Sequence, residues 1–312
     1  MGAAFFGDND VASVMTAILA GMATTLGALL LTLTPVDPKR GTSTWLACPK
    51  SNPAKRAWEV FNLKYAVLWV GCFAVIIGFD LYEGFDEVSY FVVCFGLCIP
   101  IFAFPLLSVH PSEAGLPFGQ RFGVRANLWI LIYSFIGNYW YTHYFYSVLG
   151  AKYTFPSWRL NDVPIPLIFA TVFYFSLYHA LSNMPIRKVV TSFEANTART
   201  VALAVLVGVM SYAVAFAETL TISGFPYYSF DDRDMAYAVG SAFYGIYFIV
   251  SFPMFYAFDE WPQQNGQAIR EAGGSAQGLW GAAVNSMGAG MLILCLLDFV
   301  RLAIGSELTL KG

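Results

Sequence analysis

The chain has 312 residues, of which 57% are apolar and only 12% are charged, with a formal net charge of −3. Soluble domains carry about 25% charged residues, so this composition excludes an ordinary water-soluble enzyme. There is no basic cluster of the kind that binds nucleic acid, and we expect no nucleic-acid partner. The five cysteines and three histidines do not follow the spacing of a disulfide framework or a metal site, so we expect no bound metal.

Long apolar runs recur along the chain, and a membrane-spanning helix needs about 20 mostly apolar residues. The first run follows Asp8 and Asp10 rather than basic residues, and it is too long for the apolar core of a signal peptide, so we interpret it as a retained span. The predicted fold is all-α, a polytopic membrane bundle of about eight transmembrane helices. The predicted spans are residues 11–34, 64–82, 88–109, 126–149, 163–183, 201–223, 236–258 and 281–304.

Most of the 17 Lys and Arg residues fall in the loops after the odd-numbered spans. Cytoplasmic loops of membrane proteins are enriched in these residues, so we expect both chain termini on the lumenal side. Residues 35–62 form the longest basic linker. We divide the chain into residues 1–52, which hold the first span and most of this linker, and a membrane-embedded domain of about seven helices at residues 53–312.

Ionisable side chains inside spans are costly to bury, so each one is a candidate functional group. His143 and Glu218 lie at similar depth near the lumenal ends of the fourth and sixth spans, whereas His179 lies nearer the basic side. A protonated carboxylic acid or an imidazolium can act as a general acid. Each residue also has a structural interpretation, which is a hydrogen bond between helices for Glu218 and a place at the membrane interface for the histidines.

Two other patterns stand out. Asp298 and Arg301 are three residues apart in the last span and can meet on one helical face, which favours a structural ion pair. The fourth span is dense in aromatic residues and includes Tyr139, Trp140 and Tyr144. Aromatic faces stabilise a cation, but they suit a flat polycyclic ligand and ordinary membrane packing as well.

One stretch of the sequence points to a particular protein family. Residues 125–164 read RANLWILIYSFIGNYWYTHYFYSVLGAKYTFPSWRLNDVP, and this stretch strongly resembles the cycloeucalenol cycloisomerases of plants and algae, also called cyclopropyl-sterol isomerases. The resemblance extends in order from about residue 53 to 305. It continues in FSLYHALSN (175–183), ETLTISGFPYYSFDDR (218–233), AFYGIYFIVSFPMFYAFDE (242–260) and GMLILCLLDFVRLAIG (290–305).

The resemblance implies an enzyme that opens the 9β,19-cyclopropane ring of cycloeucalenol to give the Δ8 sterol obtusifoliol, without cofactor or metal. The chemistry needs an acid that protonates C19 and a base that accepts the C8 proton. Glu218, His143 and His179 fall in matching motifs, and we expect Glu218 or His143 to be the acid and the other to be the base. The residues expected to bind substrate are Tyr139, Trp140, Tyr144, Tyr227 and Tyr228.

The resemblance also implies a sterol substrate within the bilayer, membrane lipid as surroundings, and the endoplasmic reticulum or another organelle membrane as location. Residues 1–52 lie outside it, and their span is a candidate contact for other membrane proteins. A second interpretation is a non-catalytic, lipid-binding subunit of a larger complex that keeps the isomerase fold. A proton-coupled transporter needs a polar path across the whole bilayer, whereas the polar groups here gather near one side.

Overall fold

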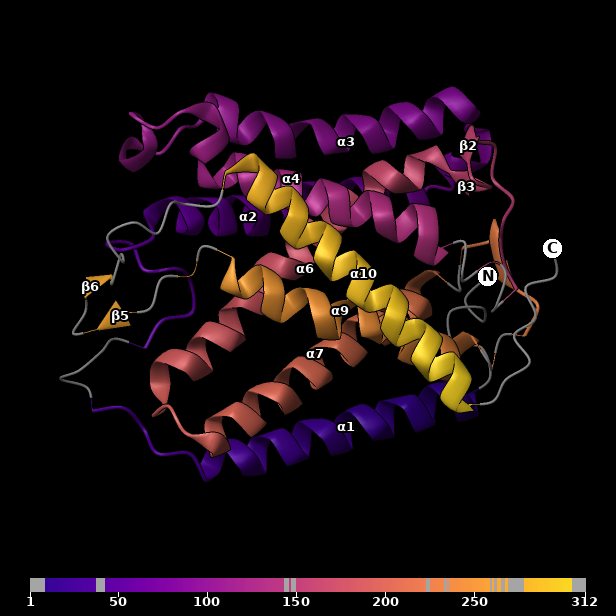
Figure 1. Ribbon diagram of the computed structural model, residues 1–312. Coiled ribbons are helices and arrows are strands. Elements are labelled where there is room, and N and C mark those ends of the chain that lie inside the picture. Colours follow the sequence, from indigo (N-terminus) through magenta and orange to yellow (C-terminus); the bar gives the residue numbers. More distant parts are fainter. Residues whose placement is uncertain are drawn as a thin grey trace.

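The structure is a computed structural model that describes residues 9–37, 43–142, 146, 150–222, 225–232, 234, 236–258, 260, 263–264, 267–268 and 278–304. The described α-helices are α1 (Asn9–Leu31), α2 (Pro53–Gly78), α3 (Glu87–Leu107), α4 (Phe122–Ile136), α6 (Ile165–Ser192), α7 (Thr197–Ile222), α9 (Ser241–Ala257) and α10 (Leu279–Ile304) (Figure 1). Six of them, all but α4 and α9, are long and apolar enough to cross a membrane, and α9 is a shorter apolar helix. The prediction of an all-α polytopic bundle is confirmed.

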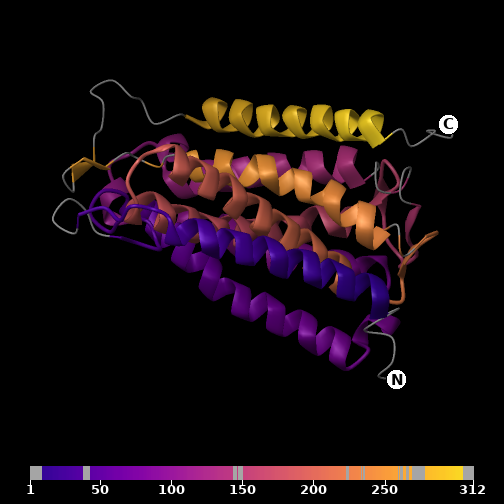
Figure 2. The same ribbon diagram turned by 90° about the horizontal axis from the view of Figure 1, so that it is seen from below.

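Helix α6 lies at the centre of the bundle, where it packs against α2, α3, α4, α7 and α9. Helix α10 covers α4 and α9 as an outer layer, and α1 runs along α7 (Figures 1 and 2). The start of α1 and the end of α10 lie at one end of the bundle, and the turn between α6 and α7 lies at the other end (Figure 1). This alternation of helix directions agrees with the predicted order of spans.

Helix α2 begins earlier than predicted. Residues 53–62 were expected to belong to the basic linker, with the span starting at residue 64, but α2 starts at Pro53, which occupies the first turn where a missing backbone N–H is tolerated. The charged residues Lys55 and Glu59 are typical of a loop, and for this reason the sequence predicted a linker here. Both side chains are fully buried and paired in the structure, and this pairing is what permits charged residues inside the helix.

The predicted span at 126–149 is not one regular helix. Helix α4 ends at Ile136, and the chain continues as the π-helix η4 (Gly137–Thr142). The side chain of Asn138 donates to the backbone carbonyl of Ser134, one of the acceptors that the last turn would otherwise use, and Gly137 weakens the helix at the same point. Single π-helical turns are frequent at functional sites.

Short elements close the two ends of the bundle. Strands β1 (Ala151–Tyr153) and β4 (Tyr228–Phe230) form an antiparallel ribbon in which Tyr153 is paired with Tyr228. The other short elements are η1 (Leu81–Gly84), η2 (Pro111–Glu113), η3 (Phe118–Gln120), η5 (Ala236–Gly240) and the strand pairs β2 (Arg159–Leu160) with β3 (Val163–Pro164) and β5 (Gln263–Gln264) with β6 (Gln267–Ala268).

A buried charge network lies at the end of the bundle opposite the β1–β4 ribbon. Arg187 of α6 contacts Glu59 of α2 at 2.7 Å and Glu260, beyond α9, at 2.8 Å. Lys55 contacts Glu260 at 2.7 Å and donates to the carbonyl of Phe258. Two cations therefore face two carboxylates. The network connects α2 and α6 to the segment that follows α9.

Candidate functional site

A cavity of about 320 Å³ lies toward the end of the bundle that carries the β1–β4 ribbon. This volume is in the range of small-molecule sites. Helices α2, α3, α6, α7 and α9 line it, together with η4 and the ribbon. Most of the lining side chains are apolar or aromatic. The aromatic ones are Phe73, Tyr82, Phe85, Tyr90, Tyr146, Tyr153, Phe155, Tyr174, Phe175, Tyr178, Phe225, Tyr228, Tyr244 and Tyr247.

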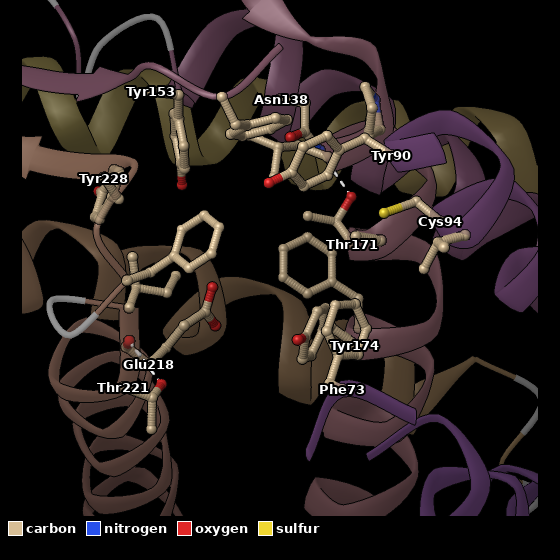
Figure 3. Close-up of a pocket in the computed structure, with 18 of the residues that line it drawn as sticks. Phe73, Tyr90, Cys94, Asn138, Tyr153, Thr171, Tyr174, Glu218, Thr221 and Tyr228 are labelled. Carbon is tan, nitrogen blue, oxygen red and sulfur yellow. Dashed lines mark hydrogen bonds between the residues drawn. The ribbon is translucent and has the colours of Figure 1, made fainter. Parts of the chain in front are cut away.

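Glu218 is the one carboxylic acid among the described residues that line the cavity. It lies near the end of α7, and its carboxylate points into the cavity (Figure 3). The hydroxyl of Tyr244 on α9 donates to its Oε2 at 2.8 Å, and the hydroxyl of Tyr178 on α6 also donates to it. Three helices thus meet at one acidic group. These two phenols fix the direction of the carboxyl group, and both are neutral hydrogen-bond donors rather than cations.

A second polar group lines the cavity, away from Glu218 (Figure 3). The amide nitrogen of Asn138 donates to the hydroxyl oxygen of Thr171 on α6 at 2.7 Å and to the carbonyl of Ser134 at 2.8 Å. Asn138 is buried. The wall made by η4 and α6 therefore presents a hydrogen-bonded polar pair among mainly apolar and aromatic side chains.

The β1–β4 ribbon contributes two phenols. Tyr153 points its hydroxyl into the cavity, and Tyr228 lies beside it with the ring centroids 4.3 Å apart (Figure 3). Burial raises the pKa of both Tyr153 and Tyr228, so both phenols keep their protons near neutral pH. They can donate and accept hydrogen bonds there, but they do not supply a phenolate.

The structure separates the predicted substrate-binding residues. Tyr228 lines the cavity, but Tyr227 packs against the rings of Tyr82 and Phe225 and does not line it. The rings of Tyr139 and Trp140 meet edge to face outside the lining, and Trp140 is 52% exposed. In their place the preceding two residues of the same segment, 137 and 138, line the cavity. Tyr144 lies outside the described residues.

The two histidines proposed for catalysis differ in what the structure shows. His179 is fully buried but does not line the cavity, and rings such as Trp129 and Phe255 surround it. Its Nδ1 bonds to the carbonyl of Phe175 at 2.7 Å and its Nε2 to the hydroxyl of Ser251 at 3.0 Å. Its ring nitrogens are therefore satisfied within the helix packing. His143 lies outside the described residues.

The expected ion pair in the last span does not form. Asp298 is exposed on the surface of α10 and Arg301 is half-buried in its last turn, and none of the ion pairs between described residues joins them. A spacing of three residues allows two side chains to contact on one helical face but does not enforce the contact. Because α10 is an outer helix, both side chains can extend into the surroundings of the bundle instead. Within the described part of the chain, no group of three or more His, Cys, Asp or Glu residues is placed to hold a metal ion.

Comparison with known proteins settles the family. The chain is 40% identical over 266 residues to a protein of Arabidopsis thaliana named cycloeucalenol cycloisomerase, and the alignment covers 84% of this chain and 90% of that protein. The chain belongs to the cycloeucalenol cycloisomerase family. Members of this family are isomerases, and the resemblance read from the sequence motifs is confirmed. No family model and no solved structure matches the chain.

For this family member, sequence reasoning missed several residues of the cavity. Tyr178 stands next to His179 in the motif FSLYHALSN, but successive residues of a helix point about 100° apart, so only one of the two can face the cavity. Asn138 and Thr171 carry no charge and were not singled out. Tyr244 could have been found only with knowledge of which helices are neighbours.

Proposed function

We propose that this chain is a membrane sterol isomerase that opens the 9β,19-cyclopropane ring of cycloeucalenol-type sterols to give a Δ8 sterol, obtusifoliol. The observation that supports this most directly is a mainly apolar and aromatic cavity of about 320 Å³ whose described lining holds a single carboxylic acid, Glu218, in a chain 40% identical to a protein named cycloeucalenol cycloisomerase. A cyclopropane has no leaving group and no acidic hydrogen. Opening it therefore requires a proton donor in a protected site.

The proposed reaction moves protons without net gain or loss. A proton is added at C19, and the electron pair of the C9–C19 bond forms the new C–H bond of a methyl group. Positive charge develops at C9. The C8–H bond then breaks, its electron pair forms the C8=C9 double bond, and the proton leaves to a base.

Glu218 is the proposed donor of the C19 proton. When the proton leaves, a carboxylate remains in a cavity of low polarity, where it would be unstable without partners. The hydroxyls of Tyr178 and Tyr244 already point at this carboxyl and can stabilise the negative charge as it develops. The two phenols are therefore part of the proposed acid.

His143 is the proposed acceptor of the C8 proton. This assignment comes from the sequence, which places His143 on a different span from Glu218 but at similar depth in the membrane. His179 was a third candidate. It is left out of the proposed mechanism because its packed position, away from the cavity lining, gives it no access to a sterol there.

The aromatic side chains that line the cavity are proposed to stabilise the positive charge that develops at C9. The rings of Phe73, Tyr174 and Phe175 line the cavity, and a π-face attracts a positive charge within about 6 Å. Neutral phenols and phenyl rings are also poor nucleophiles. They stabilise the charge at C9 without capturing it as a covalent product.

The surroundings of the enzyme are part of the proposal. Sterol and bilayer lipid are the proposed partners, the membrane is that of the endoplasmic reticulum, and the cavity end of the bundle together with both termini faces the lumen. The division into residues 1–52 and 53–312 is proposed to reflect an added N-terminal helix, which packs along α7 and offers its other face to membrane-protein partners.

The experiment that tests the proposed function is direct conversion. The chain is purified in detergent micelles, mixed with cycloeucalenol, and the sterols are separated by gas chromatography with mass spectrometry. Obtusifoliol is the expected product, with Glu83→Gln, an exposed glutamate in η1, as the control that keeps activity. Folded protein that returns cycloeucalenol unchanged would contradict the proposal and favour a lipid-binding subunit.

A further inference from the structure

The hydrogen bonds of Asn138 determine which way its amide faces. A backbone carbonyl can only accept, so the atom that bonds to the Ser134 carbonyl at 2.8 Å must be the amide nitrogen. The hydroxyl of Thr171 donates to the carbonyl of Ile168 at 3.0 Å, which leaves its oxygen to accept from the second N–H of Asn138 at 2.7 Å. Both N–H groups of the amide are thereby used within the protein.

The amide oxygen of Asn138 is the part of the amide that these two hydrogen bonds do not use. No described residue donates to Oδ1 of Asn138, although Asn138 is buried and lines the cavity. Among the described residues, the fully buried side-chain oxygens and nitrogens without a partner do not include this oxygen, so it is reachable from the cavity. Polar groups inside proteins normally find a hydrogen-bond partner. The site therefore presents an acceptor with a fixed direction, and its complement is a ligand that brings a hydroxyl donor into a mainly apolar and aromatic cavity.

We infer that the amide oxygen of Asn138 accepts a hydrogen bond from the 3-hydroxyl of the sterol, with Thr171 as the residue that positions the amide. The inference rests on the proposed function for the identity of the ligand. The sterol carries one hydroxyl donor on an otherwise apolar skeleton, and the amide oxygen of Asn138 is an acceptor without a described donor in a mainly aromatic lining. Figure 3 shows this pair and Glu218 on different sides of the cavity, so the hydroxyl end and the reacting ring meet separate groups.

The arrangement has a consequence for substrate choice. Because Asn138 and Thr171 have no free N–H or O–H to offer, the site discriminates in favour of a hydroxyl and against a 3-ether or 3-ketone, which can only accept. A site built to hydrogen-bond a hydroxyl rejects analogues that lack it far more strongly than a hydrophobic pocket rejects a change of size. Thr171 acts through Asn138, so it is a positioning residue.

The test compares cycloeucalenol with its 3-O-methyl ether as substrates of the purified chain. The wild type is expected to prefer the free hydroxyl by roughly 100-fold in kcat/KM. Asn138→Leu is expected to lower kcat/KM for cycloeucalenol by roughly 10- to 100-fold while the ether is little affected, so that the preference collapses. Thr171→Val is expected to lose part of the preference, and Thr171→Ser, which keeps the hydroxyl, to retain it.

The results that would contradict the role of Asn138 can be told apart from a failure of the proposed function. Equal conversion of both sterols by the wild type, or a parallel loss of both in Asn138→Leu, would overturn the role of Asn138. If the wild type converts neither sterol, the proposed function fails, and displacement of radiolabelled cycloeucalenol by each sterol decides the inference instead. A preference for the hydroxyl that Asn138→Leu abolishes would support it, and equal displacement would overturn it.

Discussion

The hydroxyl of Tyr244 donates a 2.8 Å hydrogen bond to Oε2 of Glu218, and this bond joins α9 to α7 at the wall of the cavity. Glu218 also accepts from Tyr178 of α6. In the proposed mechanism these two phenols stabilise the carboxylate that remains after Glu218 has given its proton to C19. The relationship makes the acid a unit of three residues from three helices.

Replacing Glu218 by Gln removes the transferable proton and keeps nearly the same shape. General acid catalysis contributes typically 10²- to 10⁴-fold, so we expect kcat for cycloeucalenol to fall by roughly 1,000-fold. Binding of the sterol, measured by displacement of a radiolabelled ligand, should change little. A variant that turns over at the wild-type rate would remove Glu218 from the mechanism.

Tyr244→Phe removes one of the two hydrogen bonds to Glu218 without changing the ring. Removing a single donor to a developing anion in a preorganised site costs up to 10²- to 10³-fold, and because Tyr178 remains we expect a fall in kcat of roughly 10- to 100-fold. Tyr212→Phe is the matched control, since its hydroxyl contacts Sδ of Met15 outside the cavity lining. Equal effects of the two substitutions would indicate general loss of packing.

His143→Ala tests the proposed acceptor of the C8 proton. We expect kcat to fall by roughly 100-fold, while membrane insertion and sterol binding persist. His110→Ala serves as control, because in the described part of the chain the imidazole of His110 bonds only to neighbouring Ser112 at the start of η2. If His143→Ala keeps full activity, the C8 proton must leave to another base.

The charge network at the other end of the bundle predicts a dependence of stability on pH. Burial alone would raise the pKa of Glu260, but Lys55 and Arg187 outweigh burial, and the pKa is lowered below its usual value. A carboxyl with a lowered folded-state pKa contributes stability above its unfolded value of about 4.3, and this contribution is lost as the pH falls through the folded-state pKa. The apparent unfolding temperature of the wild type should therefore decrease as the pH is lowered below about 4.

Glu260→Gln isolates this contribution. Among the described residues, it leaves Arg187 paired with Glu59 and removes the carboxylate partner of Lys55, and breaking a buried pair costs about 3 kcal/mol or more. The variant should unfold at lower temperature at pH 7, with a smaller further loss on acidification. The control is Asp231→Asn, whose ion pair with Lys152 is exposed and should contribute little. Identical pH profiles of wild type and Glu260→Gln would contradict the assignment.

The fold was predictable from sequence because spanning helices are long apolar runs, and the eight runs correspond to the described helices. Some boundaries were wrong, among them the end of α6, which is Ser192 rather than residue 183, and two of the errors have a clear physical reason. Charges at Lys55 and Glu59 indicate a loop unless their partners are known, and Glu260 and Arg187 lie far away in the sequence. The π-helical turn depends on how the side chain of Asn138 competes for a backbone carbonyl, and no periodicity reports it.

The candidate site was predictable only in part. Glu218 stood out because a carboxyl within an apolar run needs an explanation, and the structure places it in the cavity. His179 stood out for the same reason, yet it is packed among rings while its neighbour Tyr178 faces the cavity. Which residue of a helix faces a cavity depends on the neighbouring helices. That information is absent from one sequence.

The measurement that tests the central claim most directly is turnover of cycloeucalenol by the purified chain in heavy water, with analysis of the product by mass spectrometry and NMR. If Glu218 exchanges its proton with solvent and donates it, obtusifoliol will carry one deuterium in the C19 methyl group, and Glu218→Gln will form almost none of this product. Obtusifoliol without deuterium at C19, or undiminished labelling in the variant, would contradict proton donation by Glu218.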